Sequence, residues 1–331
     1  GLLTTADDMG RFLSAMLASA RGGRSFLKAG TVAEMWRRQN GKQKADLDFS
    51  VGLGWWLGPV DSLPGETVVV HGGDWLPFCS LALVLPERDL AIFVMANSLE
   101  GDSSMSLEPL ALELLRAFAA SERGVELGRA EAAGPSRPVP ADLRARLVGD
   151  WASLAGLIRI GEAGGRLKIG FAGKTFDAAL RTDGRVEMQL RLLGCKLPVA
   201  ALEEFQLSAE ESEGRPLLGF RSHGILLSAC ERVAPVEPGP EWRARVGRYR
   251  LVNAAEGLVR DVELGLSPEG YLTLRYKFFG GPRPREYPLA VLDGKRAILM
   301  GSGRNLGESV VAELREGRER LRWSGFLLER R

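Results

Sequence analysis

The strongest constraint on this chain is an internal duplication in its second half. The segment RARLVGDW at residues 144–151 is echoed by RARVGRY at residues 243–249. Gly149 and Gly247 are 98 positions apart, and the same offset separates Glu231 from Glu329. A period of this length is too long for a solenoid unit, so it predicts a duplicated domain.

Each copy has the pattern of a series of short antiparallel strands. Glycine pairs and Asp-Gly steps separate the apolar segments, which is typical of strands joined by tight turns. These segments include Leu157–Ile160, Arg166–Ile169, Val186–Leu192, Tyr271–Tyr276 and Ala297–Met300. Because closing a sheet removes its unpaired edges, seven or eight such strands predict a small barrel. We expect one barrel over residues 143–235 and a second over residues 241–331.

Residues 1–122 have a mixed α and β pattern. Thr5 is a suitable N-cap for a helix with apolar residues at helical spacing, and a second short helix is expected near residues 31–38. An apolar run at residues 67–70 predicts a strand that leads into His71. Continuous apolar runs at Cys79–Leu85 and Leu90–Ala96 predict a hairpin that is buried on both faces.

A helix over residues 107–120 would cover one face of this sheet, and no segment stands out as the cover of the other face. Residues 123–142 are rich in Pro, Gly and Ala, which favours a linker. The sequence therefore predicts an α+β chain. Its parts are an antiparallel sheet with helices in residues 1–122, a linker at 123–142, and two small antiparallel barrels.

Composition excludes several classes of protein. The 331 residues are 45% hydrophobic and 26% charged, as in ordinary globular proteins. The chain has no apolar run of the roughly 18 residues needed to span a bilayer, and its first residues have no secretory signal pattern. We therefore expect no transmembrane segment, and the sequence assigns no compartment. The three cysteines and two histidines form no disulfide framework, zinc pattern or His-rich site, so we expect no metal or cofactor.

Charge is unevenly distributed along the chain. Residues 1–122 carry 10 basic and 15 acidic residues, whereas the remaining 34 basic and 27 acidic residues give the rest a net charge of +7. The excess is mostly single arginines in strand-like segments. This pattern favours the solvated surface of a barrel over a phosphate-binding stripe, and we expect no nucleic-acid partner.

Three motifs of the N-terminal part occur in the order found in one enzyme superfamily. Residues 1–12, GLLTTADDMGRF, are similar to its Gly-Leu-x-Ser-Thr-Ala-x-Asp-Met-x-x-Phe helix start. Residues 51–55, VGLGW, are similar to its Tyr-Gly-Leu-Gly-Trp strand, and His71-Gly72-Gly73 to its His-Gly-Gly strand. Residues 1–120 therefore resemble the C-terminal portion of the serine β-lactamase-like hydrolases. This superfamily contains class C β-lactamases, penicillin-binding DD-peptidases, esterases and D-aminopeptidases, and lipocalin-like barrels follow the domain in some members.

This resemblance implies a role for His71 and the three residues after it. His71 would lie beside the substrate, Gly72 and Gly73 would let the substrate backbone approach the strand, and the peptide N–H near Asp74 would bind the oxyanion. The alternative is a structural histidine at a strand end, before a Gly-Gly turn. His223 has no partner pattern and is expected to be a turn residue.

The nucleophile of the superfamily is not evident in this chain. A serine hydroxyl needs a neighbouring base to take its proton, which the superfamily supplies through Ser-x-x-Lys and Tyr-x-Asn motifs. No tyrosine precedes Tyr249. Ser25 and Lys28 fit Ser-x-x-Lys formally, but they follow a predicted helix at a Gly-Gly turn remote from the superfamily's catalytic position. We interpret this match as a decoy.

Two functions remain in competition. The chain is either the C-terminal part or subunit of a serine hydrolase, or a non-catalytic protein whose barrels bind or shield a ligand. In the first case, a companion polypeptide carrying Ser-x-x-Lys would complete the site, and the substrate would be a β-lactam, a D-amino-acid peptide or an ester. Alone, the chain is then expected to be inactive. A third interpretation is a fragment with no independent role.

Overall fold

The computed structural model describes the whole chain except residues 1, 59, 76–77, 98–106, 130–133, 155, 172, 193–194, 198, 200–201, 203–204, 223–224, 254–258, 279–283 and 302–305. The described residues form two compact units. The first holds residues 1–132 with 221–227, and the second holds residues 133–220 with 228–331. No described helix is long and apolar enough to cross a membrane.

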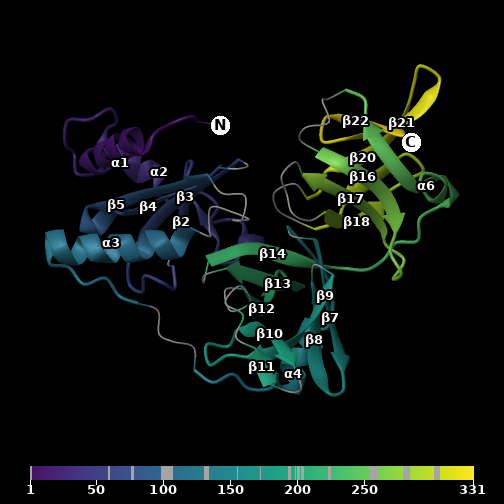
Figure 1. Ribbon diagram of the computed structural model, residues 1–331, viewed down its shortest axis with the longest axis horizontal. Helices are drawn as coiled ribbons and strands as arrows, with labels where there is room; N and C mark the ends of the chain where they lie inside the picture. The colour runs from purple at the N-terminus through teal and green to yellow at the C-terminus, as the bar shows by residue number, and fades with distance from the viewer. Residues whose placement is uncertain are drawn as a thin grey trace. The chain divides into compact units, whose positions relative to one another are not determined.

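An antiparallel five-stranded sheet, in the order β1-β2-β3-β4-β5, is the centre of the first unit (Figure 1). The strands β4 and β5 form the hairpin expected from the sequence, with Leu85 opposite Leu90. The elements in chain order are α1 (Ala6–Ala20), α2 (Ala29–Met35), η1 (Lys44–Asp46), β1 (Ser50–Val51), β2 (Trp56–Gly58), β3 (Val68–Trp75), β4 (Phe78–Leu85), η2 (Pro86–Arg88), β5 (Leu90–Asn97) and α3 (Glu108–Arg123).

Helices cover both faces of this sheet. The predicted cover is α3, which packs Ala111, Leu112 and Leu115 against one face. The other face is covered by α1 and α2, through a cluster that includes Met16 and Val32. Figure 1 shows α1 and α2 on the opposite side of the sheet from α3. The second cover, which the sequence pattern did not identify, is therefore the N-terminal helical pair.

The start of α1 follows the predicted capping chemistry. Thr5 has an extended backbone conformation, and its Oγ1 accepts a hydrogen bond from the Asp8 amide at 3.2 Å. Asp7 and Asp8 lie in the first turn, where the helix dipole stabilises negative charge. The cap fixes where α1 begins, and hence which of its faces packs on the sheet.

Two eight-stranded antiparallel barrels follow, as the duplication predicts. Barrel 1 closes by pairing β10 with β9, and β11 is an additional strand on β10. Its elements are α4 (Ala141–Leu147), β6 (Gly149–Ser153), β7 (Gly156–Ala163), β8 (Arg166–Phe171), β9 (Lys174–Leu180), β10 (Val186–Leu192), β11 (Cys195–Leu197), β12 (Phe205–Ser212), β13 (Arg215–Ser222) and β14 (Ile225–Val233).

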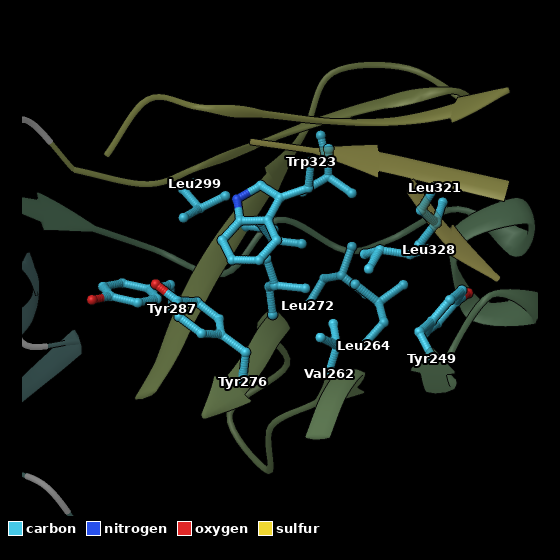
Figure 2. Packing of buried hydrophobic residues seen from close by; sticks show 14 of the residues in the cluster. Tyr249, Val262, Leu264, Leu272, Tyr276, Tyr287, Leu299, Leu321, Trp323 and Leu328 are labelled. Carbon is cyan, nitrogen blue, oxygen red and sulfur yellow. The ribbon is translucent and has the colours of Figure 1, made fainter. Parts of the chain in front are cut away.

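Barrel 2 closes by pairing its first strand, β15, with its last, β22. Its interior is filled by aromatic and aliphatic side chains, as Figure 2 shows for Tyr276, Trp323 and Leu272. Its elements are α6 (Pro240–Ala244), β15 (Gly247–Leu251), β16 (Val259–Leu266), β17 (Leu272–Phe278), β18 (Arg285–Val291), β19 (Arg296–Leu299), β20 (Ser309–Arg315), β21 (Arg318–Trp323) and β22 (Phe326–Arg330).

The repeated motif forms the same closure in both barrels. In barrel 1, the Arg232 guanidinium lies 4.8 Å from the Trp151 ring centroid and donates to the carbonyls of Arg146 and Val148, both at 2.8 Å. The indole N–H of Trp151 donates to the Leu147 carbonyl at 2.9 Å. The last strand is thereby tied to the short helix that precedes the first strand.

Barrel 2 repeats this closure 98 residues later. Arg330 donates to the carbonyls of Ala244 and Val246 at 2.7 and 2.9 Å, and the Tyr249 hydroxyl donates to the Arg245 carbonyl at 2.6 Å. Burial raises the pKa of Tyr249 to about 12, so its hydroxyl keeps the donated proton at neutral pH. The same contacts are made in both barrels, which explains why the two copies of this motif are recognisably similar in sequence.

The glycine that begins each first strand makes room for this arginine. Gly247 has φ +152°, and a Cβ at this position would lie 3.0 Å from Arg330 Nε; Gly149 has φ +146° and faces Arg232 in the same way. A positive φ in this range is disfavoured for residues with a side chain. Both the backbone and the space therefore require glycine.

We predict that Gly247→Ala lowers the free energy of unfolding by about 1–3 kcal/mol, because it combines backbone strain with a contact against Arg330. Guanidinium denaturation followed by tryptophan fluorescence measures the change. Gly10→Ala is the control, since its new Cβ has no neighbour within 4 Å inside α1 and should stabilise the protein by about 0.5–1 kcal/mol. Equal stability of wild type and Gly247→Ala would contradict this account.

Candidate functional site

The second half of β3 is paired on one edge only within the described sheet. The strand β2 pairs with β3 from Val68 to Val70, where Trp56 lies opposite Val70. The strand β4 accompanies β3 further, from Val69 to Trp75. Residues 71–75 therefore have backbone N–H and C=O groups that face away from β4 and have no partner strand among the described residues. The motif His71-Gly72-Gly73-Asp74 lies entirely within this segment.

Two tryptophans hold the His71 ring. The Trp56 ring stacks on it at 5.8 Å between centroids with an interplanar angle of 24°, and the Trp55 ring meets it edge-on at 6.5 Å. Trp55 is buried in the cluster beneath α1, so it is a fixed support. His71 itself is exposed. The imidazole thus packs against two indole rings while the residue as a whole remains exposed.

Gly73 permits a close approach between β3 and β4. Ser80 lies directly opposite Gly73, and a Cβ on Gly73 would be only 2.6 Å from Ser80 Oγ. Because alternate residues of a strand share a face, His71, Gly73 and Trp75 lie on the same face of β3. The Ser80 hydroxyl therefore occupies the space between the His71 and Trp75 positions on that face. Sequence analysis did not identify Ser80, since its importance arises only from the strand register.

Asp74 lies on the opposite face, across from Cys79. Burial raises the pKa of the Cys79 thiol, and the negative charge of Asp74 raises it further. A thiol with a raised pKa is a poor nucleophile at neutral pH. Cys79 is therefore a core residue, as its position in an apolar strand predicted.

Three large apolar side chains on the same face of the sheet as His71 are exposed. Trp75 and Phe78 are opposite each other and are 69% and 54% exposed, and Met95, opposite Ser80 on β5, is 44% exposed. Soluble proteins rarely leave such a group of large apolar side chains in contact with water without a function. This face is suited to an apolar substrate group or to further polypeptide.

Ser25 and Lys28 do not form a nucleophile and base pair in this structure. Ser25 lies in the bend after α1, and its Oγ donates to the Ala15 carbonyl at 2.9 Å. Lys28 is the N-cap residue of α2. No hydrogen bond joins these two residues, both of which the structure describes. The contact with Ala15 gives Ser25 a structural role and supports its interpretation as a decoy.

Among the described residues, no three His, Cys, Asp or Glu side chains lie close enough together to hold a metal ion. His223 lies outside the described residues. The candidate site thus consists of the β3 segment, its two tryptophans and Ser80.

Comparison with protein families agrees with the fold of the first unit. Residues 1–116 match the family model described as Beta-lactamase. This part of the chain is β-lactamase-like. The resemblance indicated by the three sequence motifs is thereby confirmed for the N-terminal third, and both barrels that follow it are present as expected.

The part of this chain that matches three solved structures spans about half the length of each of them. The crystal structure of SurE with D-Leu is 19% identical, with a TM-score of 0.46, over 69% of this chain and 50% of that one. A second crystal structure of SurE is 21% identical, with a TM-score of 0.46, over 69% and 48%. The octameric penicillin-binding protein homologue from Pyrococcus abyssi is 14% identical, with a TM-score of 0.32, over 69% and 46%. Comparison with the curated proteins finds no match.

The stacking of Trp56 on His71 gives a spectroscopic prediction. We expect Trp56→Leu to move the ring-proton NMR signals of His71 downfield, because the shielding ring current of the indole is lost. The chain has only two histidines, so His71→Gln assigns the signals. Trp75→Leu is the control, and it should leave these signals in place because Trp75 has no ring contact with His71. Unchanged signals in Trp56→Leu would exclude the stacked arrangement.

Proposed function

We propose that residues 1–116 form one wall of the active site of a serine hydrolase that works through an acyl-enzyme. The observation that carries the proposal is the segment of β3 over residues 71–75, which pairs with β4 on one edge and has no strand of the described sheet on the other. This segment contains His71-Gly72-Gly73-Asp74, and the His71 ring packs against two tryptophans. An extended substrate would add to this edge as a further strand and bind through backbone hydrogen bonds. The two glycines leave this edge free of side chains.

The reaction that such a wall serves has two steps. A serine hydroxyl attacks the carbonyl carbon of the substrate while a base takes its proton, and the leaving group departs with a proton to give an ester with the enzyme. Water then attacks this ester and releases the acid and the serine. In both steps the oxyanion needs two N–H donors, one of which we assign to the β3 backbone near Asp74.

We assign the nucleophile to polypeptide outside these 331 residues, in the same protein or in a companion chain. Two observations favour this assignment. Ser25 already donates to the Ala15 carbonyl, and the apolar face formed by Trp75, Phe78 and Met95 is exposed beside His71. A helical segment carrying Ser-x-x-Lys would cover that face and bring its hydroxyl to the β3 edge. The expected substrates are β-lactams, D-amino-acid peptides or esters.

The alternative is a non-catalytic protein whose barrels bind a ligand. Barrel 2 gives this alternative little support, because its interior is occupied by its own side chains: Leu264, Leu272, Leu274, Leu289 and Leu328 are all at most 1% exposed. Its aromatic residues fill the remaining space, with Tyr276 and Trp323 only 4.6 Å apart between ring centroids. We therefore favour the hydrolase.

Covalent labelling tests the proposal. We expect neither a fluorescent penicillin nor a fluorophosphonate to label the chain alone, and we expect labelling when it is co-expressed with the polypeptide encoded immediately upstream. Ser25→Ala should be labelled as efficiently as wild type in that assembly. Labelling of the chain alone that is lost in Ser25→Ala would overturn both the decoy interpretation and the proposed origin of the nucleophile.

The fit between Gly73 and Ser80 allows a second test in the same assembly. We expect Gly73→Ala to slow acylation on the order of 100-fold, because the new Cβ would displace the β3 edge from the position that orients the substrate. Ser80→Ala alone should have little effect. The double variant Gly73→Ala/Ser80→Ala removes the contacting oxygen and should recover part of the rate. Normal acylation by Gly73→Ala would show that this edge does not bind substrate.

A further inference from the structure

One end of barrel 2 carries exposed leucines on successive turns. In an antiparallel barrel alternate strands end on the same side, so the turns after β16, β18 and β20 lie together, at the end where α6 leads into β15. Leu266, Leu292 and Leu314, at these three turns, are 41%, 52% and 76% exposed. We call this the α6 end of barrel 2. Leucines so exposed bury only part of their apolar surface within the barrel, and Leu314 buries least.

Arginines line the wall of the barrel next to this end. Arg315 and Arg318 are directly opposite each other on β20 and β21, and the Arg331 amide donates to the Arg248 carbonyl at 2.9 Å across β22 and β15. Like charges directly opposite each other destabilise a sheet. Six arginines face outward on this wall, together with Glu313 and Glu329: Arg248, Arg250, Arg315, Arg318, Arg320 and Arg322.

Glutamates neutralise only part of this charge. Glu313 pairs with Arg315 and Arg322, Glu329 pairs with Arg250 and Arg318, and Glu316 pairs with Arg320, at distances from 2.6 to 3.3 Å. Six guanidinium groups thus face three carboxylates. Four of the paired arginines stay accessible, since Arg250, Arg315 and Arg322 are 52–55% exposed and Arg318 is 71% exposed, whereas Arg320 is only 14% exposed.

The remaining acidic residues at this end do not reverse its charge. Glu269 is paired with Arg159 of β7 in barrel 1, Asp293 with Arg296, and Glu319 with Arg245, and Glu241 of α6 interacts electrostatically with Arg245. Over residues 241–331 the sequence has 18 Lys and Arg against 12 Asp and Glu, a net charge of +6. The arginines that are scattered in sequence therefore meet on one side of one barrel, beside its exposed leucines.

We propose that the α6 end of barrel 2 binds the surface of a lipid bilayer that contains anionic phospholipids. The leucines of the three turns would enter the interfacial region, and the arginines would bind headgroup phosphates. Guanidinium groups suit this role because they bind phosphate oxygens through paired N–H donors. The proposal is independent of the chemistry assigned to β3.

A nucleic acid is the less favoured partner for this surface. Proteins that bind single strands present aromatic side chains on which bases stack. Every aromatic residue of barrel 2 that the structure describes is buried or half-buried, including Trp242, Tyr271 and Phe326. Exposed leucines, by contrast, have a favourable place in a bilayer interface and none along a phosphate backbone.

Vesicle co-sedimentation tests the proposal with the full chain. We expect binding to vesicles of phosphatidylcholine with 30% phosphatidylglycerol, little binding to pure phosphatidylcholine, and loss of binding in 0.5 M NaCl. Arg248→Ser/Arg318→Ser should weaken binding on the order of tenfold or more, at roughly fivefold for each arginine. The matched control is Arg260→Ser/Arg275→Ser, which removes two exposed arginines from β16 and β17 and should change binding much less.

Leu314→Ser separates a bilayer from a soluble polyanion. It should weaken vesicle binding several-fold and leave the retention on heparin resin unchanged, and its exposure makes an effect on folding small. Equal loss in the two arginine double variants, or no effect of Leu314→Ser on vesicle binding, would overturn the proposal. So would tighter binding to a single-stranded oligonucleotide than to anionic vesicles at the same salt concentration.

Discussion

Both barrels depend on an arginine of the last strand that reaches back to the start of the first. Arg232 and Arg330 satisfy the carbonyl groups at the end of a short helix, and Arg232 also covers the Trp151 ring. Both arginines are exposed, so their contribution comes from hydrogen bonds to helix-end carbonyls that would otherwise have only water as a partner. The arginine therefore fixes the position of the entering helix, the register of the closing strand and the glycine at the strand start. This mutual dependence accounts for the survival of the motif in two copies that differ almost everywhere else.

Much of this architecture could be predicted from the sequence, because several of its elements are determined by residue patterns that the sequence displays directly. The residues that close each barrel stand at the same spacing in both copies, so the duplication leaves a visible period of 98 positions. The helix at Ala6–Ala20 carries its cap and its apolar spacing within one short segment. The hairpin β4–β5 is apolar on both faces, which only a sheet covered on both sides explains. The helix α1 and the hairpin β4–β5 were predictable because the residues that determine each of them lie close together in the sequence.

Features that depend on register were not predictable in this way. Sequence patterns gave no reason to single out Ser80, because only the pairing of β3 with β4 brings it opposite Gly73. The covering role of α1 and α2 was equally hidden, since an amphipathic helix does not specify the sheet face on which it packs. The arginines of barrel 2 appeared scattered, because residues two apart on one strand and residues opposite each other on neighbouring strands share a face only after folding.

The sequence predicted the four consecutive residues of the candidate site, and the structure added the side chains that contact them. The motif His71-Gly72-Gly73-Asp74 is contiguous and was found directly. The contacts of His71 with Trp55 and Trp56 come from the structure, since the family resemblance in the sequence includes His71 and Trp55 but not Trp56. The roles of these residues in a reaction remain part of the proposal, whereas the β-lactamase-like character of residues 1–116 is shown by the family match.

Residues 71–75 of β3 have no second partner strand among the described residues, which has a consequence for the solubility of the protein. A strand edge of this kind is a template on which a strand from another molecule can add, and neighbouring aromatic residues such as Trp75 would strengthen that addition. Two successive glycines weaken strand pairing, and the carboxylate of Asp74 repels an identical edge. The two glycines and Asp74 thus limit self-association along this edge of β3.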